Sequence, residues 1–430
     1  MQSYDEAINS ASEIIANAMI KQLEQVTEHG LNLDDQITEI MRPVAHNVEE
    51  MVLQAAHSML LDRYQQQGWK VERHPTVPFK TLHGEIRIKS PYLKKEDEVK
   101  GLRPMLLHFG VRGRGMSLNL ERTLCSFGAE KSFPKAAKLF TEHYGQTIDI
   151  TTLQRHTEAM GEHAESWLDD RYQHANNEQL QEASEVISEL DGCEIRTGLF
   201  SDDRKTREIK WKECRTGVVH VLGSLDSLYV CANAPYSELC DNILACTDLC
   251  GRTRETRIIA PGDGAQGLME TMVETIPNLK YILDHRHLES HFYETAQELG
   301  YTDRARELWV RRHMGGLWAN DYERIHESLA NEYQHTKNDR LRCLINHLDR
   351  FSACVDYGYC RKLGWPVGSG EVESANRYIP QERMKIPGAT WHPDHLNPML
   401  ALRVVRACDW WNQFWQWKSD HLRVSIPKAA

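Results

Sequence analysis

Residues 181–287 predict a core of mixed α and β structure (α+β or α/β), because three strand-like runs are followed there by helix, strand, helix and strand. This order, βββαβαβ, is that of the ribonuclease-H-like fold. The first and fourth strands are neighbours in that fold, and in this chain each is followed by an aspartate, Asp191 and Asp263. The sequence therefore predicts that these two carboxylates lie together.

The elements of this core are assigned from the spacing of apolar residues. The first strand contains Val186, Ile187 and Leu190, and we expect it to end at Asp191-Gly192. After it come strands at 218–222 and 228–231, a helix at about 237–250, a strand at 257–260, a helix around 268–276, and a strand at 279–283 that ends at Asp284.

Two regions precede the core. Residues 1–68 have apolar residues at helical spacing, interrupted near Gly30 and Pro43, and predict an acidic helical region of two or three helices. Residues 69–180 predict a basic region in which strands are followed by helices.

The basic region ends in a pattern typical of a helix-turn-helix. A helix beginning near Ser132 is followed by a break at Tyr144-Gly145-Gln146 and by a second helix beginning near Thr151. Arg155 and His156 lie early on the second helix, where a DNA-reading helix meets base edges. Helix pairs of this kind also occur in α-rich proteins that do not read DNA, so both interpretations stay open.

The core is interrupted and resumes near the C-terminus. Residues 288–365 have helical spacing and no strand pattern, which predicts an all-helical insertion, and the core resumes at 366–395. There the turn Gly368-Ser369-Gly370 predicts a helix start with Glu371 and Glu373 in the first turn. Two residues along a helix are rotated by about 200°, so only one of these glutamates can face the sheet.

The last predicted element is a C-terminal aromatic helix within residues 396–430. Its aromatic residues recur at helical spacing, and we interpret them mainly as core or as a subunit interface. They are Trp410, Trp411, Phe414, Trp415 and Trp417.

Charge is distributed unevenly along this chain of 430 residues, whose net charge is −11. Residues 1–68 carry eleven acids against three bases, whereas residues 80–122 carry ten bases against five acids. Arg112 and Arg114 in the basic segment are therefore candidate phosphate contacts, with a solvated charged face as the alternative. No signal peptide or membrane span is seen, and the 11 cysteines include no Cys-x-x-Cys pair, which favours a cytoplasmic protein that does not enter a membrane.

Three carboxylates, Asp191, Asp263 and Glu373, stand at Gly-containing junctions between predicted elements. The chain has 62 Asp and Glu residues, most of which must be solvated surface groups. Strand ends and helix starts are, however, the places where side chains of a scaffold converge. Their positions suggest a metal-dependent enzyme that acts on nucleic acid.

The motifs around these carboxylates form a longer pattern. They are Asp191-Gly192, Gly262-Asp263-Gly264-Ala265, Leu283-Asp284-x-x-His287, Pro366-x-Gly368-Ser369-Gly370-x-Val372-Glu373, Arg383-Met384-Lys385-x-x-Gly388 and Trp391. This pattern resembles the DDE transposases of bacterial insertion sequences, in particular the Kra-type branch, which is related to the Mutator-like group. The similarity covers most of residues 70–420.

The resemblance implies a role for each matching residue. Asp191 and Asp263 match the two aspartates of the family's catalytic triad, and Glu373 matches its glutamate. Asp284 and His287 match an Asp/Cys-x-x-His signature and are further candidates for the site. Many relatives carry paired cysteines before the core, whereas residues 89–104 contain none, so an N-terminal zinc module is doubtful.

Such a triad implies two Mg²⁺ ions, with Mn²⁺ as a substitute. Two divalent ions about 3.5–4 Å apart can activate a nucleophile and neutralise a leaving oxyanion, and magnesium prefers hard oxygen ligands. We expect Asp191 to bridge the ions, while Asp263 and Glu373 each complete one coordination shell. His287 is open to three interpretations: a ligand, a phosphate contact or a packed core histidine.

Two cations beyond the triad, Arg383 and Lys385, are expected to contact phosphates beside the scissile bond. The alternative is an interaction with the C-terminal dipole of their own helix.

The sequence therefore predicts a DNA transposase that cuts and rejoins the ends of its own insertion sequence. Its partners would be the terminal inverted repeats, target DNA and further copies of the chain assembled on DNA, in a bacterial cytoplasm at the nucleoid. Two other classes remain: a ribonuclease-H-like nuclease without strand transfer, and a non-catalytic DNA-binding derivative.

Overall fold

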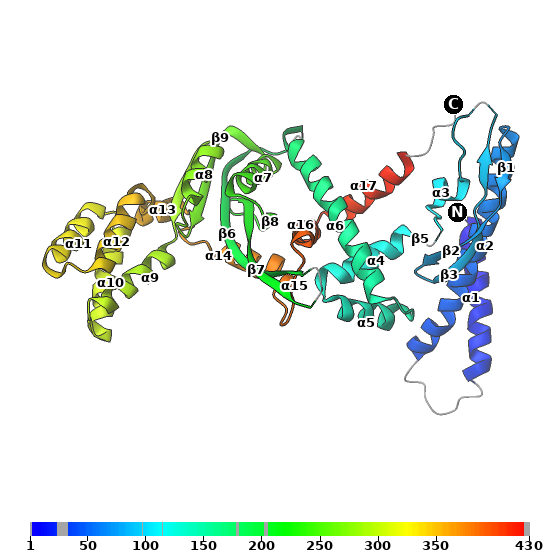
Figure 1. Ribbon diagram of the computed structural model, residues 1–430, viewed down its shortest axis with the longest axis horizontal. Helices are drawn as coiled ribbons and strands as arrows, with labels where there is room; N and C mark the ends of the chain where they lie inside the picture. Colours follow the sequence, from blue (N-terminus) through cyan, green and yellow to red (C-terminus); the bar gives the residue numbers. More distant parts are fainter. Residues whose placement is uncertain are drawn as a thin grey trace. The chain divides into compact units, whose positions relative to one another are not determined.

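The computed structural model describes residues 2–23, 33–96, 98–113, 115–177, 180–201 and 205–424 (Figure 1). The chain divides into two compact units between Leu120 and Glu121. Each unit has its own buried apolar core. None of the described helices is long and apolar enough to cross a membrane.

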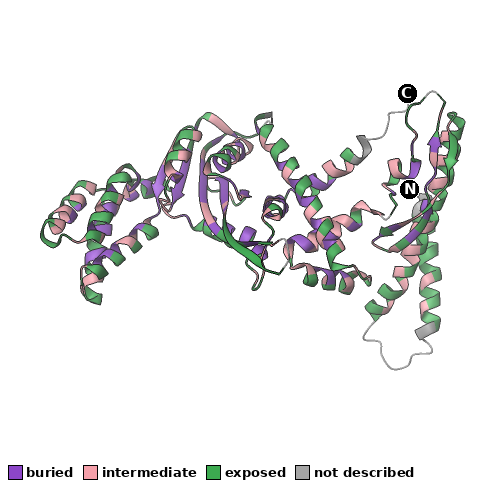
Figure 2. Cartoon of the chain, in the orientation of Figure 1, coloured by how far each residue is buried: buried purple, intermediate pink, exposed green. Residues whose placement is uncertain are grey.

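The first unit combines two long helices with short strands. Its elements are α1 (Gln2–Leu23), α2 (Leu33–Gln66), β1 (Lys70–Arg73), β2 (Thr76–Thr81), β3 (Gly84–Lys89), β4 (Tyr92–Lys94), α3 (Pro104–Phe109) and β5 (Gly115–Met116). The break predicted at Pro43 is wrong, because Pro43 lies inside α2. Gly30 lies outside the described residues. Leu53 of α2 packs with Phe79, Ile86 and Ile88 of the sheet β3-β2-β5, while both helices are largely exposed (Figure 2).

Three helices open the second unit: α4 (Leu118–Glu130, from Glu121 onward), α5 (Phe133–Tyr144) and α6 (Ile150–Gln173). The predicted pair of helices is therefore present as α5 and α6. Gly145 ends α5 in a left-handed conformation (φ 67°), which glycine adopts without steric cost. Asp149 caps α6 by accepting a hydrogen bond from the Thr152 amide.

The five-stranded sheet of the second unit has the predicted sequence of elements. It comprises β6 (Ala183–Phe200), β7 (Arg207–Val221), β8 (Leu228–Ala232), α7 (Tyr236–Leu249), β9 (Arg252–Gly262), α8 (Leu268–Thr275) and β10 (Leu279–Leu283). The strand order is β10-β9-β6-β7-β8. β7 and β8 run antiparallel to their neighbours, whereas β9 and β10 are parallel. The first and fourth strands are thus neighbours, as predicted.

β6 is longer than the sequence predicted. It does not end at Asp191 but continues to Phe200, because its pairing with β7 extends to Phe200 opposite Arg207. Beyond Asp191 it also pairs along its other edge, where Thr197 forms a bridge with Trp391. Cys193 and Ile195 are buried while Glu194 is exposed, an alternation typical of a strand. Asp191 therefore lies within a strand rather than after one.

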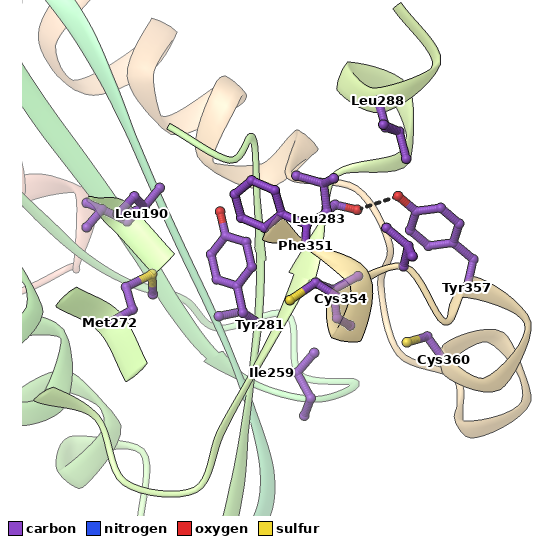
Figure 3. Packing of buried hydrophobic residues seen from close by; sticks show 14 of the residues in the cluster. Leu190, Ile259, Met272, Tyr281, Leu283, Leu288, Phe351, Cys354, Tyr357 and Cys360 are labelled. Atoms are coloured by element: carbon purple, nitrogen blue, oxygen red, sulfur yellow. Dashed lines mark hydrogen bonds between the residues drawn. The ribbon is translucent and has the colours of Figure 1, made fainter. Parts of the chain in front are cut away.

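A group of helices follows β10. Between β10 and Trp391, which pairs with β6, the described residues form no strand. It consists of α9 (His285–Glu298), α10 (Asp303–Trp318), α11 (Tyr322–Thr336), α12 (Asp339–Arg350), a 3-10 turn (Ser352–Cys354) and α13 (Tyr357–Leu363). Its last part packs on β10: Phe351 and Tyr357 lie beside Leu283, and the Tyr357 hydroxyl donates to the Leu283 carbonyl at 2.9 Å (Figure 3). The insertion is therefore anchored where β10 ends.

The chain then returns to the sheet. The remaining elements are α14 (Gly370–Asn376), a π-helical turn (Arg377–Gln381), α15 (Glu382–Met384), a 3-10 turn (Pro393–His395), α16 (Leu396–Ala407) and α17 (Trp411–Val424). α7 packs on the Gly217 side of the sheet, where Ile243 lies against Gly217. α14 packs on the other side, beside Val218.

Residues 396–424 form two helices, and the aromatic residues gather at the second: Trp411, Phe414, Trp415 and Trp417 lie on α17, and Trp410 directly precedes it. The chain turns between α16 and α17 at Asp409, whose φ is 55°. Trp410 and Phe414 are buried, and each stacks edge-on against Trp167 of α6 at a ring distance of 5.9 Å. The prediction that this stripe packs as core is confirmed for these two residues.

Candidate active site

Three acidic residues lie in or directly after three neighbouring strands of the sheet. β6 and β9 are paired in parallel up to Ile187 and Ile259, and Asp191 and Asp263 each follow four residues later, within electrostatic reach of each other. In the pair β9–β10, Gly262 lies opposite Leu283, and the next residues are Asp263 and Asp284. The sheet order therefore gathers residues that lie 72 and 21 positions apart in the chain.

Asp191 is held by two hydrogen bonds and is partly buried. The Gly192 amide donates to its Oδ1 at 2.7 Å, and Asn376 Nδ2 donates to its Oδ2 at 2.7 Å. Burial raises the pKa of Asp191, the negative charge of Asp263 raises it further, and the two hydrogen bonds and His287 oppose the shift. Both causes of the rise are ones that a nearby cation would relieve.

Asp263 sits in the loop that leaves β9. Its Oδ1 accepts a hydrogen bond from the Ala265 amide at 2.9 Å. The chain turns at Gly264, whose φ of 79° favours glycine, and a Cβ there would approach Leu283 Cδ1 to 2.8 Å. The glycine after Asp263 thus permits a tight turn against β10.

The two glutamates of α14 face different neighbours. Glu373 Oε1 lies 3.6 Å from His287 Nε2 at the start of α9, and His287 is also an electrostatic neighbour of Asp191. Glu371 Oε2 lies 3.1 Å from His220 Nε2 on β7. Glu371 also lines a cavity of about 340 Å³ with Tyr229 and other residues, but Glu373 does not. Glu373 is therefore the glutamate of this pair that contacts His287, a neighbour of Asp191.

The carboxylates suit a hard divalent cation by their chemistry. Carboxylate oxygens are the ligands that magnesium prefers, and Asp191 and Asp263 place two of them within electrostatic reach of each other. Within the described ranges, no three His, Cys, Asp or Glu side chains are near enough to one another to hold a metal ion. Glu373, whose side chain is 60% exposed, is paired with His287 instead.

Asp284 joins α9 to the turn before α14. Its Oδ1 accepts from the amides of Arg286 and His287 at 2.7 and 3.1 Å, and its Oδ2 accepts from the Ser369 amide and hydroxyl at 2.6 and 2.7 Å. Although burial favours the neutral acid, these hydrogen bonds hold the pKa of Asp284 below its usual value. Both oxygens of Asp284 therefore accept their hydrogen bonds from the protein itself.

Glu189 and Asn376 belong to this site, and sequence reasoning missed both. Glu189 is only 2% exposed, lies two residues before Asp191 on the same face of β6, and accepts from the Val372 amide at 2.8 Å. Burial raises its pKa to about 8. Asn376 follows Glu373 by three residues and so shares its side of α14. The two spacings, i+2 in a strand and i+3 in a helix, are the signals that could have identified them.

Arg383 does not lie where a phosphate contact requires it. Its side chain is 2% exposed, its Nε donates to the Gly128 carbonyl at 2.9 Å, and its guanidinium stacks on Phe133 and Trp391 at 4.6 and 4.8 Å from the ring centres. In this structure Arg383 is a packing residue, and the expectation that it contacts DNA needs correction. The aromatic rings on α5 and on the segment after α15 keep the Arg383 guanidinium buried.

Lys385, in contrast, is exposed. Burial raises the pKa of the Cys193 thiol to about 11, and the positive charge of Lys385 opposes this rise. Cys193 follows Asp191 by two residues and points to the same face of the sheet. Lys385 therefore lies over the sheet face that carries Asp191.

The other predicted DNA contacts come from different elements than the carboxylates. Arg155 is exposed in the first half of α6, while His156 Nδ1 lies 3.2 Å from Glu121 Oε1 of α4. Arg112 is exposed in the first unit. Arg114 lies outside the described residues.

Arg383→Ala should lower the free energy of unfolding by about 2–4 kcal/mol, because it removes a hydrogen-bonded guanidinium and opens a cavity between two aromatic rings. Lys385→Ala is the matched control, since it removes an exposed cation two residues away and should change stability by less than about 0.5 kcal/mol. Urea unfolding followed by tryptophan fluorescence measures both. Equal stabilities of the two variants would contradict the packing role of Arg383.

Comparisons with known proteins complete this description. No family model matches the chain. The chain is similar to a UPF0236 protein encoded in the vanSb 3′ region of Streptococcus gallolyticus, at 22% identity over 396 residues, which cover 89% of this chain and 84% of that protein. It was also matched to the solved Drosophila P element transposase strand transfer complex with a TM-score of 0.27 and 10% identity, over 74% of this chain and 84% of that one. That likeness is too low to establish a shared fold.

Proposed function

We propose that this protein is a DNA transposase with a ribonuclease-H-like core, which cleaves and joins DNA strands at the ends of its insertion sequence through Asp191, Asp263 and Glu373. The observation that carries the proposal is that Asp191 on β6 and Asp263, directly after the neighbouring parallel strand β9, lie within electrostatic reach of each other. Glu373, on α14, contacts His287, which is an electrostatic neighbour of Asp191. The resemblance of these motifs to DDE transposases supports the same assignment.

In this proposal Asp191, Asp263 and Glu373 would hold two magnesium ions, which would activate the attacking oxygen and neutralise the leaving oxyanion. The protein's own contribution is to orient these ligands. Asn376 and the Gly192 amide fix both oxygens of Asp191. Lys385, on the same sheet face, binds a phosphate beside the scissile bond.

DNA recognition is assigned to surfaces outside the carboxylate site. Arg155 on α6 reads base edges at the terminal inverted repeats, as the second helix of a helix-turn-helix does. Arg112 contacts phosphates. The chain acts as a homo-oligomer on DNA, at the nucleoid of a bacterial cytoplasm.

The proposal is tested by incubating the full chain with a duplex of the element end and a target plasmid, in Mg²⁺, in Mn²⁺ and in EDTA. We expect metal-dependent nicks at the element end and 3′-ends joined to the plasmid. Cleavage without joining would identify a nuclease without strand transfer. Specific binding without any cleavage would identify a DNA-binding derivative.

Lys385→Ala and Arg155→Ala should weaken DNA binding in different ways. A lost phosphate contact removes about one unit from the slope of log K against log salt, so Lys385→Ala should bind all sequences more weakly. Arg155→Ala should instead lower the preference for element ends over random DNA by roughly 1–3 kcal/mol. Fluorescence anisotropy at several salt concentrations measures both. Arg311→Ala, an exposed arginine of α10, is the control, and a variant that behaves like it has no such DNA contact.

A further inference from the structure

We propose that Glu189 is a positioning residue for Glu373: from strand β6 it caps the first turn of α14 and so fixes the helix that carries this carboxylate. The inference rests on the proposed function for its catalytic consequence, but not for its structural one. Glu189 itself is buried and accepts a hydrogen bond from α14.

The start of α14 depends on acceptors from outside the helix. The first amides of any helix have no partner within it. Ser369, at the N-cap position, makes no side-chain cap. The Val372 amide instead donates to Glu189 Oε2 at 2.8 Å, and the Glu371 amide is also hydrogen-bonded to Glu189. A strand side chain thus does what a local Ser, Thr or Asp usually does.

Glu189 connects two parts of the carboxylate site through one strand. It precedes Asp191 by two residues, so both side chains leave the same face of β6. β6 is paired on both sides at Val186 and Ile187, which keeps its backbone in place. Because one strand carries Asp191 and the cap of α14, the Glu189 side chain contributes to the distance between Asp191 and Glu373, together with the hydrogen bond from Asn376 to Asp191.

A second anchor holds the turn before α14. Asp284 accepts hydrogen bonds from the Ser369 amide and hydroxyl, while Glu189 accepts from the amides that follow. With the Asp284 anchor in place, loss of the Glu189 cap should shift α14 rather than unfold it. A displacement of about 1 Å of a catalytic group can lower a rate by about 10²-fold.

The test uses two variants of similar size that differ in one acceptor. Glu189→Gln keeps an oxygen that can accept from the Val372 amide, and Glu189→Met does not. We expect Glu189→Met to lower the cleavage rate by about 10²-fold with unchanged affinity for element ends, and Glu189→Gln to stay within about fivefold of the wild type. Glu194→Ala, on the exposed face of the same strand, is the control. Glu189→Asp, shorter by one methylene, replaces Glu189→Met if that variant does not fold, and should lose activity as well.

Hydrogen exchange of the peptide that contains Val372 is a second measurement, and it does not require the protein to cleave DNA. Its exchange should accelerate by at least about tenfold in Glu189→Met and not in Glu189→Gln or Glu194→Ala. If exchange accelerates in this way but the wild type does not cleave DNA, the proposed function is wrong, whereas the capping role of Glu189 is supported. If the wild type cleaves and Glu189→Met cleaves equally fast, or Glu189→Gln falls as far as Glu189→Met, the positioning role is overturned.

Discussion

Asp191→Ala, Asp263→Ala and Glu373→Ala should each lower metal-dependent strand cleavage by about 10³-fold or more, while binding of element ends stays within about threefold. Losing one preorganised stabilising group at a reacting centre costs about 10²–10³ in rate, and losing a ligand of a metal pair removes more than one such interaction. DNA binding should persist because Lys385 and Arg155 remain. Cleavage of end-labelled duplexes, with binding measured separately in Ca²⁺, gives both numbers.

Glu371→Ala is the matched control for Glu373→Ala. Both glutamates lie in the first turn of α14, but Glu371 contacts His220 rather than His287. Its removal should cost less than about tenfold in cleavage, because its carboxylate is directed away from Asp191. Normal cleavage by Glu373→Ala together with a strong loss in Glu371→Ala would reverse the assignment.

Arg403→Met should lower the free energy of unfolding by about 3–5 kcal/mol, the usual cost of removing one partner of a buried ion pair. Arg403 is 2% exposed and lies 2.6 Å from Glu130 of α4. It also donates to the Ile379 carbonyl at 3.0 Å and to the Tyr378 carbonyl, just after α14. The variant leaves these three acceptors without that donor, and chemical unfolding measures the loss.

Arg406→Met is the control, because Arg406 contacts the same Glu130 from the same helix but is 27% exposed. We expect it to cost about 1 kcal/mol or less. A loss as large as that of Arg403→Met would mean that burial does not set the cost.

The same ion pair predicts a pH dependence. Burial would raise the pKa of Glu130, but Arg403 and Arg406 outweigh it and lower the pKa. A carboxyl whose pKa is lower in the folded state stabilises the protein above its unfolded pKa, and this stability is lost as the pH falls through the folded value. The wild type should therefore lose stability below about pH 4.5 more steeply than Arg403→Met. Thermal unfolding between pH 3 and 6 measures the difference, and parallel curves would contradict it.

Local patterns in the sequence predicted the elements of the core. Apolar runs of period two and helical spacing gave the order of strands and helices, and glycine at positions such as Gly145 and Gly264 marked where the chain turns. Adjacency of the first and fourth strands followed from that order. The length of β6 was missed because its distal half is paired with β7 and Trp391, and such pairing partners are not visible in a local pattern.

The sequence by itself determined which residue types stand at the ends of strands and at the start of α14, because these are properties of short segments. Only the tertiary structure decided what each charged side chain contacts. Arg383 and Lys385 look alike in the sequence, yet Phe133 and Trp391 bury one of them and leave the other exposed. In the sequence Glu189 is an ordinary strand residue, and its role depends on the packing of α14 against β6. Burial and hydrogen bonding depend on segments that are distant in the chain, and the free energy of a charge depends on both.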